Sequence, residues 1–382
     1  MNILIIVPTF RPNIGGVESY LDDLCEDLIK KQHNVYVIAY QPLTTRIRGL
    51  NFEKKGRLEI RRISWFGHNL FHKLEPYPVL EFLYLTPWLF IHSFFFMLKN
   101  SRKIDCLHAQ GLNAAFIARF LKAIFKKRAV MSTCAVYNFK NGSLFSKITK
   151  WTLSGFDKIL ALADFSKREL LSIGLAEDKI ATYYLWLDQD VYKPKDRREA
   201  KTEVGLGAKF IVLFVGRFIK LKGVEVLLAA AKNSSQNIFF CFIGDNGPLL
   251  ETVEKASQES KNVILIKNIR GKQLVPYYQA ADLLVVPSQY EEAFGKVIIE
   301  ALSCGTPVIG ANKGAIPDIL KPSVGKVIDP TPENISREVG FYYTNQGELA
   351  RLSKGCREYS LEHFSSKNAL VIERSYQAVN KP

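Results

Sequence analysis

Cysteine is scarce in this sequence, and its spacing shows neither a disulfide framework nor a metal-binding motif. The chain has six cysteines among 382 residues. None forms the close pairs that bind zinc or carry redox chemistry, since they are scattered as Cys25, Cys106, Cys134, Cys241, Cys304 and Cys356. This excludes a small disulfide-stabilised secreted domain. We therefore expect reduced thiols in a cytoplasmic protein.

A basic leader and low-complexity sequence are also missing. The first ten residues, MNILIIVPTF, are apolar but have no preceding basic region and no small-residue cleavage position. We interpret them as a first core strand rather than a signal peptide. With 47% hydrophobic and 23% charged residues, the composition does not indicate extended disorder. The chain is long enough for two globular domains.

Negative charge is in deficit, and the formal net charge is +15. Such a charge favours anionic partners: nucleic acid, an acidic membrane surface or a phosphorylated ligand. A basic face that is merely solvated is the alternative. We do not expect nucleic acid, because the basic residues are not interleaved with an aromatic stacking platform. The basic residues cluster in an expected loop and strand and at an expected helix end: Arg46, Arg48, Lys54, Lys55, Arg57, Arg61, Arg62, and Lys122, Lys126, Lys127, Arg128.

The most apolar segment, residues 81–98, is too short and too interrupted for a clear membrane span. A span needs about 20 clean residues, and this segment contains Pro87 and His92. Three interpretations remain: a helix packed within a domain, a partly exposed helix that docks on a membrane, and a true span. If the helix docks, nearby basic residues add attraction to anionic lipid.

Apolar strand-like runs alternate with helical patterns along the whole chain. This alternation predicts parallel sheets with helices on both faces, that is, a doubly wound α/β fold in two halves. We expect a first domain over residues 1–192, a second over 193–360, and a helical tail over 361–382 that packs back on the first. The expected strands are 2–8, 35–40, 105–109, 128–133, 158–162, 210–216, 238–244, 262–266, 282–287 and 306–310.

Loops that follow the strands carry the candidate binding residues, because ligands of doubly wound sheets sit beyond the carboxyl ends of strands. After the first strand, Gly15 and Gly16 precede a helix whose first amides can accept a phosphate, although a simple tight turn is the alternative. After strand 210–216, Arg217 and Lys222 offer a planar fork and a point charge for phosphate oxygens. Surface charge in a loop is the alternative there. Gly244 and Gly247 form a further turn of geometric role.

The stretch EEAFGKVIIE, residues 291–300, places carboxylates at both ends of an apolar run. Burying an unpaired carboxylate costs several kcal/mol, so these acids need partners. Eight residues of helix would separate Glu292 from Glu300 by about 12 Å. They can meet one ligand only if the loop folds Glu292 back over the helix start. Glu292 then faces a sugar and Glu300 a ribose, while the amides of residues 294–297 point at phosphate.

Together these motifs resemble glycosyltransferase family 4, retaining enzymes of the two-domain GT-B fold. The resemblance covers nearly the whole chain: the glycine pair after the first strand, DCLHAQG, GRFIKLKG, FIGDNGP and VPSQYEEAFGKVIIEALSCGTPVI. The last block carries the E-x7-E element of the family as Glu292 and Glu300. The resemblance therefore implies α/β architecture with two Rossmann-like domains facing a central cleft.

The resemblance also implies roles for single residues. Arg217 and Lys222 grip the donor pyrophosphate, Glu300 binds the ribose, and Glu292 contacts the transferred sugar. Gly15 and Gly16 approach the phosphate from the other domain. Main-chain groups line the same pocket at Phe294, Gly295, Lys296 and Val297. No metal and no cofactor beyond the nucleotide-sugar donor are implied.

The sequence departs from the family pattern at two places. Cys134 stands where many members carry a histidine, and a thiol cannot replace imidazole as a two-ended hydrogen-bonding group. Leu185 and Trp186 stand where the family has Asn-Gly before its aspartate, here Asp188.

The function expected from the resemblance is transfer of a hexose from a UDP- or GDP-sugar, with retention of configuration. The expected acceptor is a lipid-linked or polysaccharide hydroxyl in cell-surface glycan synthesis, met at the inner membrane face. The alternatives are an epimerase or phosphorylase of the same fold, and a non-catalytic nucleotide-sugar-binding protein.

Overall fold

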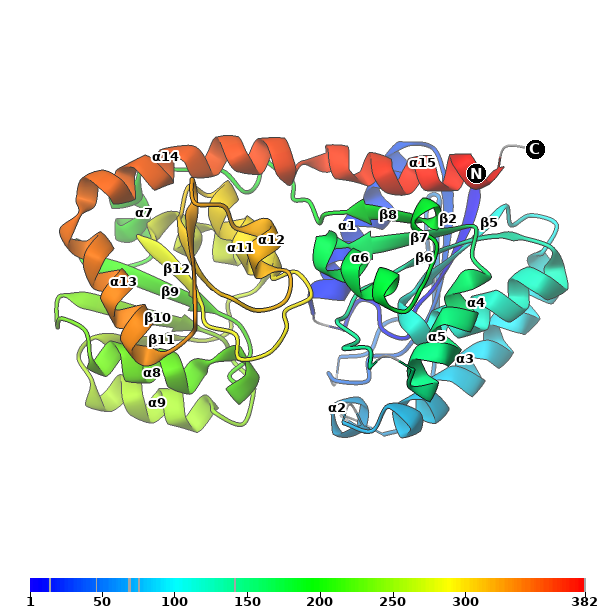
Figure 1. Cartoon of the computed structure of the whole chain (residues 1–382), viewed down its shortest axis with the longest axis horizontal. Helices are drawn as coiled ribbons and strands as arrows, with labels where there is room; N and C mark the ends of the chain where they lie inside the picture. Colours follow the sequence, from blue (N-terminus) through cyan, green and yellow to red (C-terminus); the bar gives the residue numbers. More distant parts are fainter. Residues whose placement is uncertain (14, 46, 68–69, 75, 141, 381–382) are drawn as a thin grey trace. The chain divides into compact units, whose positions relative to one another are not determined.

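The computed structural model divides the chain into two compact units, shown in Figure 1. It describes all residues except 14, 46, 68–69, 75, 141 and 381–382. The first unit comprises Met1–Tyr184 with Ser366–Pro382, and the second comprises Leu185–Ser365. The sequence placed these divisions at 192/193 and 360/361, so the two sets of boundaries differ by five to eight residues.

The first unit is built on an eight-stranded sheet of order β3-β4-β2-β1-β5-β6-β7-β8. All its pairings are parallel except the β3–β4 hairpin. Its strands are β1 Asn2–Ile6, β2 Asn34–Tyr40, β3 Phe52–Lys55, β4 Leu58–Ile63, β5 Cys106–Gln110, β6 Arg128–Ser132, β7 Lys158–Leu162 and β8 Ile180–Tyr183. Its helices are α1 Gly16–Lys30, α2 Leu70–Leu74, α3 Pro78–Asn100, α4 Gly111–Phe125, α5 Leu144–Ser154, α6 Ala163–Ser172 and α15 Ala369–Asn380.

The second unit is built on a six-stranded parallel sheet of order β11-β10-β9-β12-β13-β14. Its strands are β9 Phe210–Val215, β10 Ile238–Ile243, β11 Val263–Ile266, β12 Leu283–Val286, β13 Val308–Ala311 and β14 Gly325–Ile328. Its helices are α7 Arg197–Glu203, α8 Val224–Lys232, α9 Leu250–Glu259, α10 Val275–Ala280, α11 Lys296–Ser303, α12 Ile316–Ile319, α13 Pro332–Thr344 and α14 Gln346–His363. A 3-10 turn, Lys220–Lys222, precedes α8.

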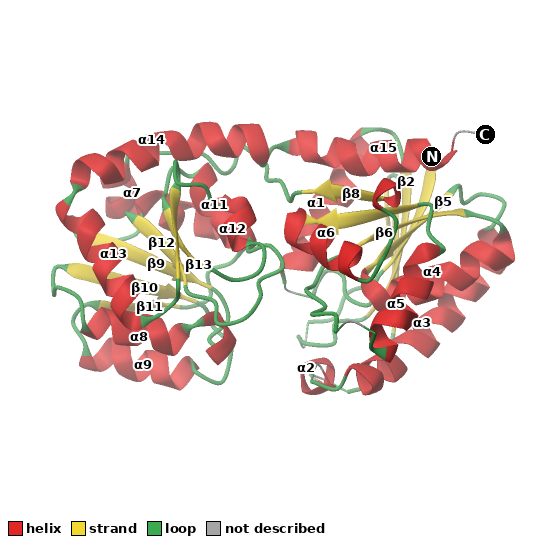
Figure 2. Ribbon diagram, in the orientation of Figure 1, coloured by secondary structure: helices red, strands yellow, loops and turns green. Residues whose placement is uncertain are grey.

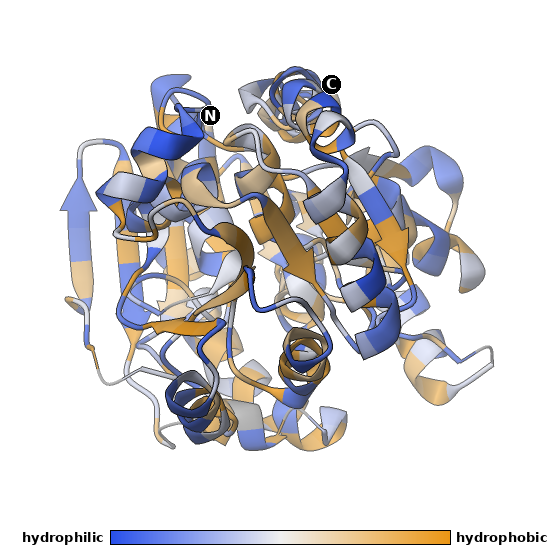
Figure 3. Cartoon of the chain, turned by 90° about the vertical axis from the view of Figure 1, so that its left-hand side faces the viewer, coloured by the Kyte–Doolittle hydropathy of each residue, from blue (hydrophilic) through white to orange (hydrophobic). Residues whose placement is uncertain are grey.

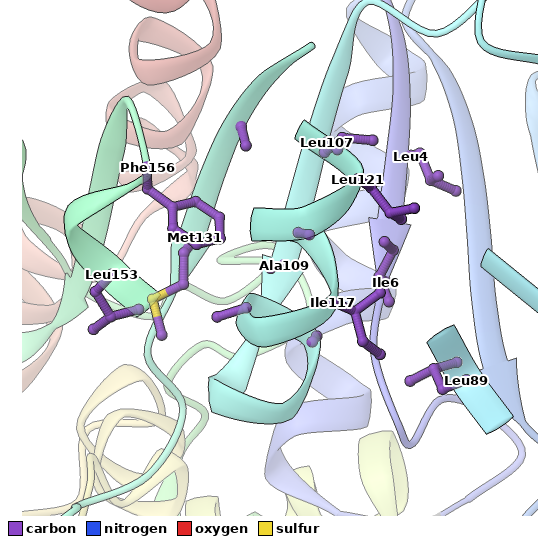
Figure 4. Packing of buried hydrophobic residues seen from close by; sticks show 14 of the residues in the cluster. Leu4, Ile6, Leu89, Leu107, Ala109, Ile117, Leu121, Met131, Leu153 and Phe156 are labelled. Carbon is purple, nitrogen blue, oxygen red and sulfur yellow. The ribbon is translucent and has the colours of Figure 1, made fainter. Parts of the chain in front are cut away.

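Helices cover both faces of each sheet, which is the expected doubly wound arrangement (Figure 2). In the first unit α3, α4 and α5 lie on one face, and α1 and α15 lie on the other. Alternate residues of a strand therefore enter different cores. Leu4 and Ile6 join the cluster under α3 and α4 together with Leu107, Ile117 and Leu121 (Figure 4). Figure 3, in which the second unit faces the viewer, shows hydrophobic strands at the centre of the fold.

The described residues contain all ten strands whose ranges were expected from the sequence, together with four others, β3, β4, β8 and β14. Strand β4, LEIRRI, lay within the segment expected to hold a loop and a strand, and it pairs with β3 as a hairpin. Strands β8 and β14 have four residues each. Both lie at sheet edges, where short runs give too little periodicity to stand out in a sequence.

The C-terminal tail forms two helices that belong to different units. Helix α14 belongs to the second unit, whereas α15 packs in the first unit against β6, β7, β8 and α1. The expected return of the tail to the first domain is confirmed, and it involves α15. Residues 381–382 of the expected tail lie outside the described residues.

Helix α15 is fixed by buried polar contacts as well as by apolar packing. The Tyr376 hydroxyl lies 2.6 Å from Nδ1 of His108, and Nε2 of His108 lies 2.7 Å from Oγ of Ser132. His108 and Tyr376 are both fully buried. Burial lowers the pKa of His108 to about 3, so the imidazole is neutral at physiological pH and uses one nitrogen as donor and the other as acceptor.

Candidate active site

The second sheet reverses its winding direction between β9 and β12, which are neighbours in the sheet but far apart in sequence. Ligands of doubly wound sheets bind in the crevice at such a switch point. The loop after β9 carries Arg217 and Lys222, and the loop after β12 carries Glu292. The two loops predicted to hold the donor therefore follow the two strands that flank the switch point.

A backbone contact joins these two loops. The N–H of Gln289 donates to the carbonyl of Leu221 at 2.7 Å. Gly223 has φ +73°, and a Cβ at this position would lie 2.0 Å from the carbonyl oxygen of Pro287. Only glycine allows this backbone conformation and this approach without strain. The close approach sets Lys222 beside the segment after β12.

Lys222 and Glu292 form a hydrogen-bonded ion pair at the centre of this arrangement. The ammonium Nζ lies 3.0 Å from Oε1 and 2.8 Å from Oε2 of Glu292. Ser288 donates to Oε2 at 3.0 Å, and Tyr290 donates to Oε1 at 3.0 Å. A carboxylate has about four lone-pair sites. Four hydrogen bonds therefore occupy the acceptor capacity of Glu292.

The pair sits in a partly desolvated environment, in which the side chain of Glu292 is 10% exposed and that of Lys222 is 23% exposed. Burial acts to lower the pKa of Lys222, but Glu292 and Tyr290 outweigh it and raise the pKa above its usual value. Burial and the neighbouring Glu292 charge raise the pKa of Tyr290. Lys222 is thus a cation and Tyr290 a neutral hydrogen-bond donor at neutral pH.

Arg217 differs from Lys222 in its surroundings. Its side chain is exposed and makes no ion pair with any of the described residues. The main chain around it is fixed, because the N–H of Phe218 donates to the carbonyl of Asn246 at 2.8 Å and Phe218 is fully buried. Arg217 is therefore a mobile guanidinium on a rigid loop, next to the switch point.

Helix α11 begins at Lys296, with Gly295 as its N-cap in the left-handed conformation (φ +82°). The first N–H groups of a helix have no partner inside the helix and favour anions. Phe294 is 3% exposed, and its ring packs edge-on against Phe364 with centroids 6.3 Å apart. Its side chain thus anchors the loop and only its main chain can face a ligand. Lys296 and Val297 follow, both half-buried.

Glu300 is the fifth residue of α11 and is buried at 7% exposure. The hydroxyl of Tyr278, on α10, donates to its Oε2 at 2.7 Å. Burial and the Glu300 charge raise the pKa of Tyr278 well above its usual value, so the hydroxyl stays a donor. Glu292 and Glu300, the two acids of the E-x7-E element, thus have different partners: Glu292 pairs with Lys222, and Glu300 accepts from Tyr278.

The loop folds Glu292 back over the start of α11, as this site requires. A Cβ built on Gly295 would lie 3.6 Å from Cγ of Glu292. Gly314 holds this loop in place, because its N–H donates to the carboxylate of Glu291. A Cβ on Gly314 would lie 2.3 Å from the carbonyl oxygen of Glu292, so a side chain has no room there. The N–H of Ala315 donates to that same carbonyl at 2.8 Å.

Sequence reasoning missed the residues that orient the two acids. Ser288 and Tyr290 lie four and two residues before Glu292. Hydroxyl groups this close to an expected buried acid were the signal that could have identified them. Tyr278 lies 22 residues from Glu300, and Gly314 lies 22 residues from Glu292. No local pattern connects residues at that separation.

The glycine pair of the first unit stands at the start of α1, as predicted. Gly15 is the N-cap and Gly16 the first helical residue, and both are exposed. A Cβ on Gly15 would lie 2.3 Å from Oε2 of Glu18, whereas nothing lies within 4 Å of a Cβ on Gly16. Asn13 donates to Oε1 of Glu18 at 2.8 Å. The carboxylate of Glu18 therefore lies at the helix start where the sequence predicted a phosphate.

Cys134 lies in the loop after β6, at the carboxyl edge of the first sheet. A Cβ built on Gly111, at the start of α4, would lie 3.1 Å from its Sγ. Burial, followed by the charge of Glu18, raises the pKa of Cys134 to about 12. The thiol is therefore protonated at neutral pH and is not an activated nucleophile. Within the described chain, no cluster of three or more His, Cys, Asp or Glu side chains could hold a metal ion.

Comparison with known families matches both units. Residues 14–191 match the family described as Glycosyltransferase Family 4, and residues 196–359 match the family described as Glycosyl transferases group 1. The chain is 32% identical over 208 residues to D-inositol 3-phosphate glycosyltransferase of Mycobacterium leprae (strain Br4923), which covers 52% of this chain and 47% of the relative. The enzyme of the same name from Mycobacterium bovis (strain BCG / Pasteur 1173P2) is 29% identical over 225 residues, or 56% and 45%. The chain thus matches about half the length of these curated relatives.

Solved structures match over nearly the whole chain and show the same GT-B fold. Sucrose-phosphate synthase from Thermosynechococcus elongatus has a TM-score of 0.80 at 20% identity, covering 99% of this chain and 98% of that one. HepE of Anabaena in complex with UDP and glucose has a TM-score of 0.78 at 17% identity, covering 99% and 100%. WaaG, a glycosyltransferase involved in lipopolysaccharide biosynthesis, has a TM-score of 0.70 at 15% identity, covering 100% of both.

Proposed function

The chain belongs to the glycosyltransferases of group 1 and family 4, and we propose that it moves a hexose from a nucleotide-diphosphate sugar to a hydroxyl, with retention of configuration. UDP-sugars are the first donors to test, because HepE, of similar fold, was solved with UDP and with UDP-glucose. GDP-sugars are the second. The proposed acceptor is a lipid-linked or polysaccharide glycan of the cell surface.

One observation carries this proposal: the loops at the second sheet's switch point hold an exposed guanidinium, a half-buried ammonium, a helix start and two buried carboxylates. These are the loop of Arg217 and Lys222, the Gly295 cap of α11, and Glu292 with Glu300. A nucleotide diphosphate has a matching order of groups, with a diol on the ribose and negative charge on the phosphates. Glu300 suits the diol, while the cations and the helix start suit the phosphates.

Charge on the departing diphosphate increases as the bond to the sugar breaks, so the groups that meet this charge lower the barrier. Arg217, Lys222 and the amides at the start of α11 are the groups available on this unit. Fixed donors of this kind need no reorganisation during the reaction. The leaving group then departs on the face from which the acceptor arrives, through an oxocarbenium-like state, as in the family's retaining mechanism.

Glu292 links phosphate binding to sugar recognition in this proposal, because its carboxylate has no vacant acceptor position while Lys222 is paired with it. Lys222 occupies one position on each oxygen, and Tyr290 and Ser288 occupy the others. When Lys222 turns toward a diphosphate, it releases at least one position on Glu292. A hydroxyl of the transferred sugar can then donate to that oxygen. Binding of phosphate and recognition of the sugar are thereby coupled through one ion pair.

The test of the proposal uses Arg217→Ala with Lys220→Ala as its matched control. Both side chains are exposed cations of the segment between β9 and α8, six and three residues before Gly223. Arg217→Ala should lower turnover with a nucleotide sugar about 100-fold or more without changing the melting temperature. Lys220→Ala should leave turnover within about twofold. Equal effects of the two changes would contradict a specific role for Arg217.

A ligand screen selects among donors and separates the alternative functions. A nucleotide sugar that binds the folded state should raise the melting temperature of the wild-type chain, and UDP-, GDP- and ADP-sugars can be compared in one experiment. Conversion of the sugar without an acceptor would indicate an epimerase, and dependence on inorganic phosphate a phosphorylase. Tight binding without transfer or hydrolysis would indicate a binding protein.

A further inference from the structure

Helices α3, α4 and α5 expose an unusual number of large apolar side chains on one face of the first unit. They lie side by side over the sheet (Figure 1), and consecutive pairs are in contact. Their outer residues are from 37% to 73% exposed: Leu80, Leu83, Trp88, Ile91, Phe95 and Leu98 on α3, Phe120 and Ile124 on α4, and Leu144, Phe145, Ile148 and Trp151 on α5. We call this set the three-helix face. Contiguous exposed apolar patches of this kind mark interaction surfaces.

The three-helix face is a rigid surface because aromatic contacts join its helices. The rings of Phe82 and Phe116 lie 5.0 Å apart, linking α3 to α4. The ring of Phe120 lies 6.0 Å from that of Trp151, linking α4 to α5. Such pairs add to the stabilisation from burial. A partner would therefore meet a preformed surface rather than three separate helices.

Helix α3 is the one helix of the described chain that is long and apolar enough to cross a membrane by length and composition. Its inner side, however, is part of the core: Leu85, Leu89 and Met97 are at most 1% exposed. The hydroxyl of Tyr40, on β2, also donates to the carbonyl of Leu85 at 2.7 Å. A span would have to leave these contacts, so the outer side alone is available to a membrane.

The charge of the three helices is strongly one-sided. Helices α4 and α5 contain no Asp or Glu, and α3 contains only Glu81. The same helices and the residues next to them carry many cations: Lys99, Arg102, Lys103, Arg119, Lys126, Lys127, Lys140, Lys147 and Lys150. Lys122 is not part of this surplus, because it is paired with Asp157 at 2.7 Å. An apolar surface with a surplus of cations is complementary to anionic lipid, whose headgroups and chains lie a few ångströms apart in depth.

Two details of the three-helix face suit the boundary between headgroups and chains. Trp151 is 48% exposed, and the guanidinium of Arg119 lies 4.0 Å from its ring centroid. Trp prefers this boundary because its ring is apolar and its N–H is polar. Beside α3, a cavity of about 170 Å³ is lined by Arg61, His92, Phe95 and Lys99 among others, which places basic groups next to apolar ones.

We propose that the three-helix face docks the protein on an anionic lipid bilayer, in the plane of the interface. This inference rests on the proposed function, since it names the surface on which a lipid-linked acceptor would be met. A second copy of the chain is the less suitable occupant, because two such faces would bring cations against cations, and Glu81 is the one acid within the three helices. The basic loop and strand expected to assist contribute less than the sequence indicated: Arg62 is buried and paired with Glu53, and Arg46 lies outside the described residues.

The experiment measures sedimentation of the full-length chain with vesicles of phosphatidylglycerol and phosphatidylcholine, and with vesicles of phosphatidylcholine alone. Binding should require the anionic lipid and should weaken at high salt, because salt screens the cations. The face variant is Leu144→Glu with Ile148→Glu, at positions 73% and 47% exposed. The matched control places the same charges on the second unit, as Phe341→Glu with Leu361→Glu, at positions 47% and 43% exposed.

The face variant should lower the vesicle-bound fraction about 10-fold or more, whereas the control should stay within about twofold of the wild type. No binding of the wild type to anionic vesicles at low salt would overturn the proposal, as would equal losses in the two variants. So would a dimer in sedimentation velocity that the face variant abolishes. Thermal stabilisation by a nucleotide sugar, measured on the same samples, is expected in all three proteins. Its absence from all three would count against the proposed function and not against docking.

Discussion

The ammonium group of Lys222 contacts both carboxylate oxygens of Glu292, at 3.0 and 2.8 Å. Lys222→Ala should reduce turnover about 100-fold to 1000-fold. It should also destabilise the second unit, by up to about 3–5 kcal/mol, because it leaves a buried carboxylate without its cation. Chemical denaturation and initial-rate assays measure the two effects separately. Undiminished transfer by Lys222→Ala would refute the role of this lysine.

The double change Lys222→Met with Glu292→Gln separates stability from catalysis. It removes both charges, so no uncompensated carboxylate remains in the site and most of the lost unfolding free energy should return. Turnover should stay low, because neither the phosphate contact nor the sugar contact is restored. Recovery of activity together with stability would show that the pair serves folding alone.

Glu300 should bind the nucleotide in a geometry that Tyr278 maintains. Glu300→Ala should weaken nucleotide affinity, and Tyr278→Phe should weaken it by about 10-fold to 100-fold, since one hydrogen bond to a charged group is worth about 1.5–3 kcal/mol. Tyr277→Phe is the control. Tyr277 precedes Tyr278 in the sequence, and its hydroxyl makes no hydrogen bond to the described residues. Titration calorimetry with UDP or GDP measures the affinities. Unchanged affinity in Glu300→Ala would remove this residue from the ribose site.

Gly223 should tolerate no side chain because the carbonyl of Pro287 lies too close, and this effect can be separated from that of its positive φ angle. Gly223 and Gly205 have φ of +73° and +71°, but a Cβ at Gly205 meets nothing within 4 Å. Gly205→Ala should therefore cost about 1 kcal/mol from the angle alone. Gly223→Ala should cost more and should lower turnover, because Pro287 and the Lys222 loop must move apart. Equal destabilisation of the two variants would show that the contact with Pro287 is not required.

Acid should destabilise the first unit through His108. Burial lowers the pKa of this imidazole to about 3 in the folded state, whereas an unfolded histidine titrates near 6.5. The unfolded chain therefore binds a proton first, so stability falls as pH drops from about 6.5 toward 3, by up to about 1.4 kcal/mol per pH unit. Denaturation of the wild type and of His108→Asn between pH 7 and 4 measures the difference. A variant with the same slope as the wild type would contradict this assignment.

The sequence sufficed for the fold because long apolar strands and strand-end loops are local signals. It placed Arg217, Lys222, Glu292 and Glu300 in the correct loops or helix for the same reason. It could not pair Lys222 with Glu292, 70 residues away, because that contact depends on β9 and β12 being neighbours. Nor could it find Tyr278 beneath Glu300 or the outward faces of α4 and α5, which only the three-dimensional packing of helices defines.

Helix α15 has a consequence for biosynthesis. It supplies Tyr376 to the buried His108 and the carboxylate of Glu373 to Lys31, so the first unit is completed by a helix that follows the second unit in the sequence. A ribosome releases residues 369–380 only after the entire second unit has been made. Until then, the nascent first unit exposes the surface that α15 covers, and its native packing is reached only after the second unit has been translated.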